Sequence, residues 1–288
     1  MSLGLKSSSL KERAESLKAV RTFFDRRGVI EVDTPLLSPY APIDTHIDIF
    51  EVEGGYLHSS PEYGMKKLLA DGAGDIYQLS HVFRKGEVGP LHRPEFTMIE
   101  WYRVETTFEA FLKENIALLA LFLGEQKVEV LSHYAAFTKH VGISPDASEE
   151  TLFKQAQKLG VEVQSVDHLW GALIEPHLGR EGITVITHFP KEEAALSKTT
   201  FINGEEVSER FELYYQGIEL GNGYHELTDP EEHLRRFEKW NKERASLGKP
   251  TYPIDSELIE ALEKGLPDCY GIALGFDRLI LLKRNECK

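Results

Sequence analysis

The amino-acid sequence predicts an α+β fold in which an antiparallel β-sheet is flanked by helices. Residues 76–84 and 96–104 alternate between apolar and polar side chains, as strands do. Residues 10–27 and 230–245 have helical patterns that stand apart from these strands. Strands and helices do not alternate regularly along the chain, so a doubly wound parallel sheet is not indicated.

The N-terminal half supplies the first elements of this prediction. Residues 10–27 form an amphipathic helix that ends at Gly28, and a short strand at residues 30–33 stops before Pro35. The strands at 76–84 and 96–104 enclose a polar loop over residues 85–95, which predicts a β-hairpin with an unusually long tip. Long loops inside compact domains are often functional. A helix follows over residues 108–123.

The C-terminal half continues the same pattern. Residues 149–160 are expected to form a surface excursion with a helix at 152–159, and buried strands are expected at 184–189 and 211–219. Pro230 begins a charged helix over 230–245, and Gly265 ends another over 256–264. Residues 271–282 form a glycine-rich strand that runs into a helix.

Size and composition are those of an ordinary globular protein. The 288 residues can bury one large core, so a single domain over 1–288 is expected. No apolar run is long enough for a membrane span, and no secretory signal is visible. Two cysteines, Cys269 and Cys287, form no ligand pattern, which fits a reduced, cytoplasmic setting. The formal charge of −14, without a basic stripe, favours a small-molecule or protein substrate over nucleic acid.

The hairpin carries the first group of candidate functional residues. Phe96, Glu100 and Tyr102 share one face of their strand, and Arg84 ends the partner strand. A guanidinium there could grip a phosphate in bidentate fashion. An ordinary Arg–Glu ion pair on a half-exposed strand explains the hairpin equally well.

A second group lies between Glu219 and Glu226. Two carboxylates seven residues apart face opposite sides of a regular strand, but a break at Gly221-Asn222-Gly223 could turn the chain and bring both into one pocket. Paired carboxylates beside nucleotide phosphates suit Mg²⁺. An Asn-Gly hairpin with solvated acids is the simpler alternative for this stretch alone.

The third group is the strand–helix junction at residues 271–278. Its glycines let a ligand approach the backbone, the helix start favours anions, and Arg278 could add a second phosphate contact. Glycines that only permit close packing are the alternative. No GxxxxGK[ST] phosphate loop is present.

In this order, the segments resemble the motifs of class II aminoacyl-tRNA synthetases, and within them the lysyl type. Residues 32–35 resemble the first motif, residues 83–84 with 92–102 the second, and residues 275–279 the third. Residues 59–62, 66–69 and 219–227 resemble the lysyl branch. The resemblance covers residues 10–282 and implies the class II catalytic fold.

Within this group the chain is most similar to the elongation factor P β-lysine ligases, which are truncated relatives of lysyl-tRNA synthetase. The first motif lies almost at the N-terminus, so no anticodon-binding domain is expected, and Ala273 stands where lysyl-tRNA synthetases have glycine. Members of this family activate (R)-β-lysine with ATP and attach it to a lysine side chain of elongation factor P. The resemblance therefore implies ATP and Mg²⁺ as co-substrate and cofactor, with lysine or (R)-β-lysine as the substrate.

The resemblance also implies roles for individual residues. Arg84 would hold the α-phosphate and Arg278 the γ-phosphate, and both are the expected catalytic residues. Glu219 and Glu226 would hold Mg²⁺ or the substrate amine. The remaining expected ATP-site residues are Lys85, Gly86, His92, Arg93, Phe96, Leu220 and Gly275. The expected substrate pocket comprises Ser60, Pro61, Glu62, Glu100, Tyr102, Asn222, Glu226 and Ala273.

One departure from the second motif bears on this assignment. Gly86 stands where the family has glutamate, so either Glu87 takes that role through a shifted loop or the contact is lost. Arg93 also replaces an asparagine that is usual in lysyl relatives.

Two other functions stay open at this point. One is a minimal lysyl-tRNA synthetase, against which the acidic balance and the missing anticodon module count. The other is a non-catalytic relative that binds an amino acid. The first-motif helix and strand, residues 10–35, are expected to form a homodimer interface by the same resemblance.

Overall fold

The computed structural model describes residues 7–286, which fold as two compact units. Of the described residues, the first unit combines 7–124 with 226–286, and the second spans 125–225. Cys287 lies outside the described residues. The expectation of a single catalytic domain over 1–288 stays a prediction, and each unit is described by itself.

The first unit is built on a mainly antiparallel sheet. Its strands are β5 (Ile76–Phe83), β6 (Glu95–Val104) and β12 (Cys269–Gly275), with the short β1 (Ile30–Glu31) parallel to β5 at the edge. A separate small sheet contains β2 (Leu37–Ser38), β4 (Gly55–Leu57) and β3 (Phe50–Val52). The register places Glu100 of β6 opposite Ala273 of β12 and Gln78 of β5.

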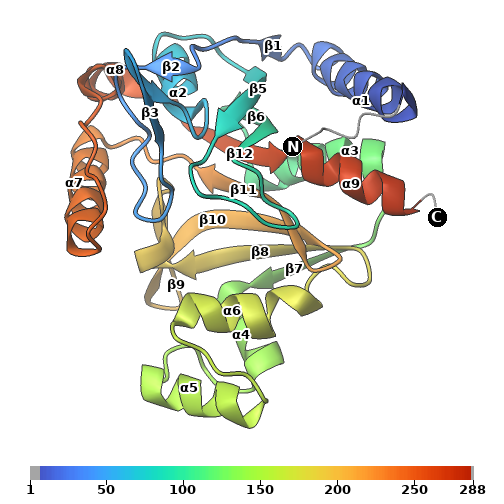
Figure 1. Cartoon of the computed structure of the whole chain (residues 1–288), viewed down its shortest axis with the longest axis vertical. Coiled ribbons are helices and arrows are strands. Elements are labelled where there is room, and N and C mark those ends of the chain that lie inside the picture. The colour runs from blue at the N-terminus through green and yellow to red at the C-terminus, as the bar shows by residue number, and fades with distance from the viewer. Residues whose placement is uncertain (1–6, 287–288) are drawn as a thin grey trace. The chain divides into compact units, whose positions relative to one another are not determined.

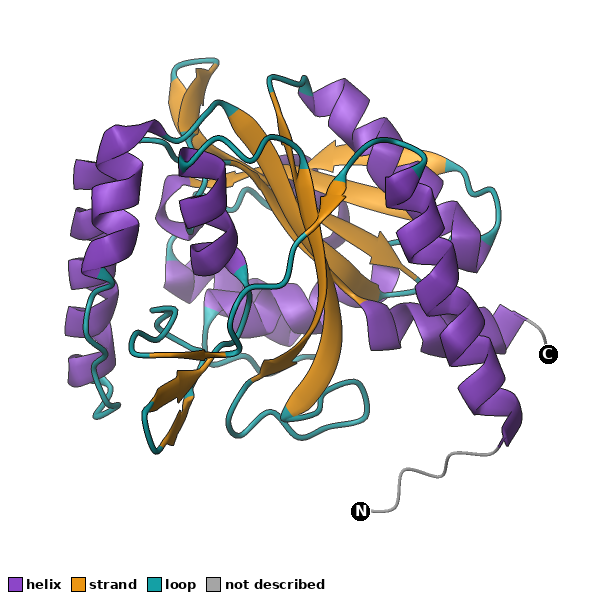
Figure 2. Cartoon of the chain, turned by 90° about the horizontal axis from the view of Figure 1, so that it is seen from above, coloured by secondary structure: helices purple, strands orange, loops and turns teal. Residues whose placement is uncertain are grey.

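Six helices of the described chain surround these sheets (Figures 1 and 2). Three pack together beside the main sheet: α1 (Ser7–Asp25), α3 (Phe108–Leu123) and α9 (Phe276–Glu286). The other three are α2 (Glu62–Ala70), α7 (Pro230–Ser246) and α8 (Ser256–Gly265), and α8 packs on both α2 and α7. Helix α7 begins at Pro230 behind the cap Asp229, whose carboxylate accepts backbone hydrogen bonds from Glu231 and Glu232.

The second unit has its own sheet and its own core. Strands β11 (Ile218–His225), β10 (Glu205–Tyr215), β8 (Ile183–Pro190) and β7 (Val128–Ser132) lie in this order, and β9 (Thr199–Ile202) adds to β10. Helices α4 (His133–Val141), α5 (Glu149–Lys158) and α6 (Val166–Leu173) lie together below this sheet in Figure 1. Two single turns, η1 (Glu175–His177) and η2 (Lys191–Glu193), complete the unit. Its buried core includes Phe137, Leu169 and Ile186.

The α+β prediction is confirmed, with two parallel pairings, β1 with β5 and β7 with β8, at the margins. The predicted hairpin is observed as β5 and β6, and the predicted helix over 108–123 is α3. Within residues 7–286, no helix combines the length and the apolar character that a membrane span requires.

Two expectations about the second unit are wrong. Residues 211–219 are not one strand, because the chain turns at Gln216 and Gly217, both with positive φ, to make the hairpin of β10 and β11. Gly221-Asn222-Gly223 is not a break but lies inside β11. The irregularity is a bulge at Leu220, where Tyr214 pairs with Glu219 and Leu213 with Gly221.

Candidate functional site

A buried carboxylate on β6 forms the centre of the candidate site. Glu100 is 2% exposed, and its two oxygens accept hydrogen bonds from Ser60 Oγ at 2.6 Å and from Tyr102 Oη at 2.7 Å. Ser60 Oγ in turn accepts the backbone N–H of Glu62 at 3.1 Å, at the start of α2. The turn before α2 and one face of β6 therefore meet in one buried cluster, called the pocket below after the role that the sequence predicts for it. Alternation along β6 predicts that Glu100 and Tyr102 share this face.

Two further acids in this pocket share one ammonium group. Lys66 Nζ lies 2.7 Å from Glu62 Oε1 and 2.7 Å from Glu226 Oε2. Lys66 follows Glu62 by one helical turn on α2, and Glu226 is brought in by the backbone bond from its N–H to Cys269 O. Lys66 and Glu226 are buried, whereas Glu62 is partly exposed.

A glycine makes this close arrangement sterically feasible. A Cβ atom on Gly271 of β12 would lie 2.4 Å from Glu226 Oε1 and 2.4 Å from Tyr102 Cε1. No side chain can be accommodated at such distances without displacing one of the two neighbours. Glu226 and Tyr102 can therefore both pack against β12 at this position only because Gly271 has no side chain.

The electrostatics of the pocket are dominated by burial and by the crowding of acids. Burial, followed by the charge of Glu62, raises the pKa of Glu100 to about 8, although its hydrogen bonds from Ser60 and Tyr102 oppose this. Burial disfavours the charged form of Lys66, but Glu226 and Glu62 outweigh it and raise the pKa of Lys66. The pocket thus holds an ion triad beside a carboxyl group that is mostly protonated near neutral pH, which makes it a receptor for added positive charge.

Arginines lie next to this pocket. The Arg84 guanidinium lies 5.3 Å from the centre of the Phe96 ring, and its Nε is 3.4 Å from the carbonyl oxygen of Ser59, which precedes Ser60. Arg278, at the start of α9, lies 3.0 Å from Nε2 of His92. Both predicted phosphate ligands therefore contact the segment from Arg84 to Phe96, although from different elements.

Asp277 fixes the start of α9 against β6. Its Oδ2 accepts the backbone N–H of Thr97 at 2.7 Å, and its Oδ1 accepts Arg13 Nη1 at 2.6 Å. Arg13 Nη2 also donates to Thr97 Oγ1 at 2.6 Å. These bonds tie the residue before Arg278 to both β6 and α1.

The long hairpin loop is held by backbone bonds near its start and by the contact of His92 with Arg278 near its end. Lys85 N–H donates to the carbonyl oxygen of Asp48 at 2.7 Å, and Arg84 N–H donates to that of Pro94 at 2.8 Å. Gly86 has a φ of +83° with nothing near its missing side chain, and Glu87 Oε1 lies 3.8 Å from Arg84 Nη1. The acid that follows the glycine is thus within reach of the motif arginine.

Three of the predicted site residues belong to the second unit: Glu219, Leu220 and Asn222. There, Glu212 of β10 pairs with Arg210, and its register partner across the hairpin is Asn222 of β11. Burial raises the pKa of Glu212, which Arg210 lowers and the charge of Glu219 raises further. The charge of Glu219 is therefore felt at Glu212, whereas Glu219 and Glu226 belong to different units and their meeting stays a prediction.

The other predicted residues are placed as follows. Pro61 precedes α2, Ala273 and Gly275 lie on β12 opposite Glu100 and Met98, and Arg93 is exposed in the loop. All of them belong to the first unit together with Ser60, Glu62, Arg84, Lys85, Gly86, His92, Phe96, Glu100, Tyr102, Glu226 and Arg278.

Sequence reasoning gave no role to Lys66, Asp277, Arg13 or Glu212. The i, i+4 spacing of Glu62 and Lys66 could have signalled a pair on one helix face. The strand alternation of Glu212 with Tyr214 could have signalled a buried acid. The contacts of Asp277 with Arg13 and Thr97 join residues far apart in the chain, and no local pattern reveals them.

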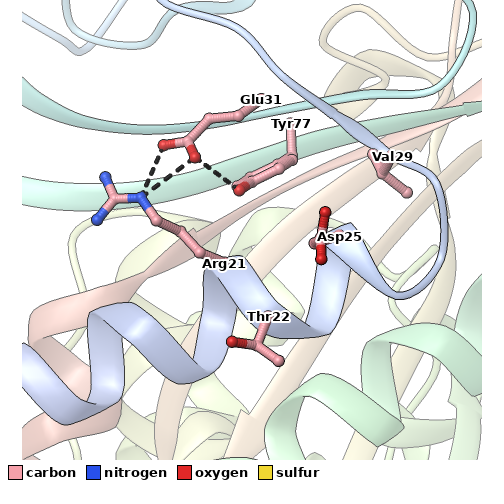
Figure 3. Close-up of a pocket in the computed structure, with 6 residues that line it drawn as sticks. All are labelled: Arg21, Thr22, Asp25, Val29, Glu31 and Tyr77. Carbon is pink, nitrogen blue, oxygen red and sulfur yellow. Dashed lines mark hydrogen bonds and ion pairs between the residues drawn. The ribbon is translucent and has the colours of Figure 1, made fainter.

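A separate hollow of about 310 Å³ lies on α1, β1 and β5 and contains none of the predicted site residues (Figure 3). Glu31 accepts hydrogen bonds from Arg21 Nε at 2.9 Å and from Tyr77 Oη at 2.8 Å, and Thr22, Asp25 and Val29 complete the lining. These polar groups are largely satisfied by one another, so the hollow is not a second candidate for catalysis.

Comparison with known proteins agrees with this geometry. The profile of the family "tRNA synthetases class II (D, K and N)" matches residues 5–286. The chain is 41% identical to an elongation factor P–(R)-β-lysine ligase from Hamiltonella defensa, over 96% of this chain and 91% of the relative. It is 42% identical to the protein of the same name from Salmonella arizonae, over 95% of this chain and 90% of the relative.

Proposed function

Because this chain belongs to the class II tRNA synthetases (D, K and N), we propose that it uses ATP to activate a lysine-like amino acid as an aminoacyl-adenylate. The observation that carries the proposal is the buried pocket of Glu62, Glu100 and Glu226, which suits a cationic amino acid. Arg84 lies beside it, held near Ser59, and suits the anionic co-substrate.

The acceptor follows from the relatives. Proteins named elongation factor P–(R)-β-lysine ligase match at 41–42% identity over nearly all of this chain. We therefore assign (R)-β-lysine as the preferred substrate and a lysine ε-amine of elongation factor P as the acceptor.

The chemistry requires no protein nucleophile. An oxygen of the substrate carboxylate attacks the α-phosphorus of ATP, the bond to the β-phosphate oxygen breaks, and pyrophosphate leaves. Arg84 stabilises charge on the α-phosphate, Arg278 binds the γ-phosphate, and Phe96 stacks on adenine. The acceptor amine then attacks the carbonyl carbon of the adenylate, forms an amide, loses a proton and releases AMP.

Mg²⁺, when bound, would neutralise phosphate charge during this displacement. Glu219 and Glu226 are the ligands expected from the sequence. Lys66 already contacts Glu226 at 2.7 Å, and Arg210 already pairs with Glu212 in the second unit, so neither of these two acids offers a carboxylate without a cation beside it. We therefore keep Glu219 as the metal ligand and assign Glu226 to the amino acid.

The decisive experiment compares amino acids and acceptors. ATP–pyrophosphate exchange is measured with (R)-β-lysine and with L-lysine, and transfer of the labelled amino acid is followed to elongation factor P and to tRNA. Faster exchange with (R)-β-lysine and transfer to the protein alone are expected. Exclusive charging of tRNA would identify a minimal lysyl-tRNA synthetase, and no ATP use with any lysine analogue would identify a non-catalytic relative.

We also propose that the chain forms a homodimer through residues 10–35. Large apolar side chains are exposed along and just after this stretch, with Leu10 at 48%, Ile30 at 56% and Leu37 at 44%. Apolar surface of this kind is typical of an interface. Light scattering is expected to give twice the chain mass, and Ile30→Glu is expected to give a folded monomer whose melting temperature no longer depends on protein concentration. A monomeric wild type would refute the proposal.

A reducing, cytoplasmic setting stays a prediction. The side chain of Cys269 is buried, which is compatible with this setting.

A further inference from the structure

Lys66 is a cation inside a pocket that we assign to a cationic substrate. It has no accessible surface, and its ammonium group is held between Glu62 and Glu226 by two contacts of 2.7 Å. An ammonium group buried without partners would be costly, so these carboxylates are what keeps it in place. The substrate must therefore bind next to acids two of which, Glu62 and Glu226, are already paired with Lys66.

Lys66 remains charged in this position. The two neighbouring acids raise its pKa, so it does not act as a base near neutral pH. The imidazole of the buried His233, on α7, is kept neutral by burial and by the charge of Lys66, which lower the pKa of His233 to about 3. Of Lys66 and His233, only Lys66 therefore carries a positive charge beside Glu62 and Glu226.

The positions of the carboxylate oxygens show where a second ammonium group can bind. Lys66 contacts Oε1 of Glu62 and Oε2 of Glu226. The Glu226 side chain is 1% exposed and its other oxygen is packed against Gly271 and Tyr102, whereas the Glu62 side chain is 19% exposed. A substrate ammonium group that cannot enter the space held by Lys66 is therefore directed to the partly exposed carboxylate of Glu62.

We propose that Lys66 is a positioning residue. Its ammonium group occupies the inner seat, the buried position between Glu62 and Glu226, and keeps the ammonium group of the substrate at the partly exposed carboxylate of Glu62. The inference rests on the proposed function and deepens it, because it states what sets the depth at which the amino acid binds. Without Lys66, the inner seat would attract the substrate's own ammonium. The substrate would then sink into the pocket, and its carboxylate would move out of line with the α-phosphate of ATP.

Chain length of the substrate tests this directly. In the enlarged pocket of the variant, lysine binds more deeply and its carboxylate moves away from the α-phosphate of ATP. Homolysine is one methylene longer, so its ammonium group can reach the inner seat while its carboxylate stays next to the α-phosphate. In Lys66→Ala, kcat for L-lysine is therefore expected to fall at least tenfold while KM for L-lysine changes little. The ratio of kcat/KM for lysine over homolysine is expected to fall at least tenfold, and KM for ATP to stay within about twofold.

Chemical rescue supplies a second measurement on the same variant. Propylammonium has the atoms that Lys66→Ala removes, so it is expected to restore exchange with L-lysine. Propanol, which has similar size and no charge, is not expected to do so. A purely structural role for Lys66 would lower stability without changing the preference for substrate length.

The matched control is Lys67→Ala, on the same helix. Lys67 Nζ pairs with Asp255 at 2.8 Å and with Glu257 at 3.0 Å, at the start of α8, and is 27% exposed. Loss of this pair is expected to leave the lysine-to-homolysine ratio unchanged and to give no rescue by propylammonium.

Each outcome has a defined meaning. If Lys66→Ala folds and keeps the wild-type ratio of lysine to homolysine, the inference is wrong while the proposed function stands. If Lys66→Ala does not fold, Lys66→Met, which retains the volume, is measured instead, and an unchanged kcat/KM for lysine in that variant would equally refute the inference. If the wild type neither binds lysine by calorimetry nor supports exchange with any diamino acid, the proposed function itself fails.

Discussion

The two halves of the candidate site are built in opposite ways. The amino-acid pocket is buried, and Ser60, Glu100, Tyr102 and the Lys66 triad satisfy one another at 2.6–2.7 Å. The phosphate side is partly exposed, and the polar contacts of the Arg84 guanidinium are long, 3.4 Å to Ser59 and 3.8 Å to Glu87. The pocket is therefore preorganised by the protein, whereas Arg84 can form shorter bonds once a polyanion binds.

This difference indicates where substitutions will act. A change in the pocket disturbs a packed and connected network, so it should affect both stability and amino-acid recognition. A change on the phosphate side removes a charge that is engaged mainly during the reaction, so it should affect rate and leave stability nearly intact.

The largest effect is expected from Arg84→Ala. Loss of the α-phosphate ligand should lower pyrophosphate exchange by at least about 10²–10³-fold, a typical loss for one preorganised donor to a transition state. The melting temperature should change little, because Arg84 is not buried in the core. The control is Arg235→Ala, which removes an exposed guanidinium on α7. Near-normal exchange in Arg84→Ala would contradict the assignment.

Gly271→Ala tests the packed half of the comparison. The added Cβ would meet Glu226 and Tyr102 at 2.4 Å, so the pocket must deform. We expect a loss of about 1–3 kcal/mol in the free energy of unfolding, as overpacking typically causes. KM for the amino acid should rise at least tenfold with KM for ATP unchanged. Gly89→Ala in the exposed loop, where the nearest atom lies at 3.7 Å, is the control.

The pH dependence of kcat/KM for lysine is expected to follow the ionisation of Glu100. Burial and Glu62 raise the pKa of Glu100 from 4.5 to about 8, so most molecules carry it protonated at pH 6. A cationic substrate favours the ionised form, and kcat/KM for lysine is therefore expected to rise between pH 6 and 8 and then level off. Glu100→Gln should abolish this rise, while KM for ATP serves as the control. A wild-type profile that is flat over this range would contradict the prediction.

The same shift affects stability without substrate. Because the raised pKa favours the protonated form in the folded state, the contribution of Glu100 is fully present below about pH 4.5. It is lost as the pH rises through about 8. Melting temperatures of wild type and Glu100→Gln should therefore diverge in favour of the variant at pH 8 relative to pH 5.

The smallest effect is expected from Glu87→Gln. Glu87 lies 3.8 Å from Arg84 on a partly exposed loop, where an ion pair contributes at most about 1 kcal/mol. KM for ATP should therefore rise by no more than about fivefold. A loss as large as that of Arg84→Ala would mean that Glu87 replaces the motif glutamate absent at Gly86.

The sequence by itself determined the hairpin of β5 and β6, the helix α3, and the shared face of Glu100 and Tyr102. These features depend on local patterns, because the alternation of a strand and the spacing of a helix face can be recognised within a short run of consecutive residues. It also determined the family, through motifs in a fixed order. Tertiary structure decided the turn at Gln216, the bulge at Leu220, and the contacts among Lys66, Glu226 and Gly271. Lys66 and Glu226 are 160 positions apart in the chain, and only the fold brings them within 2.7 Å, because burying one charge requires another beside it.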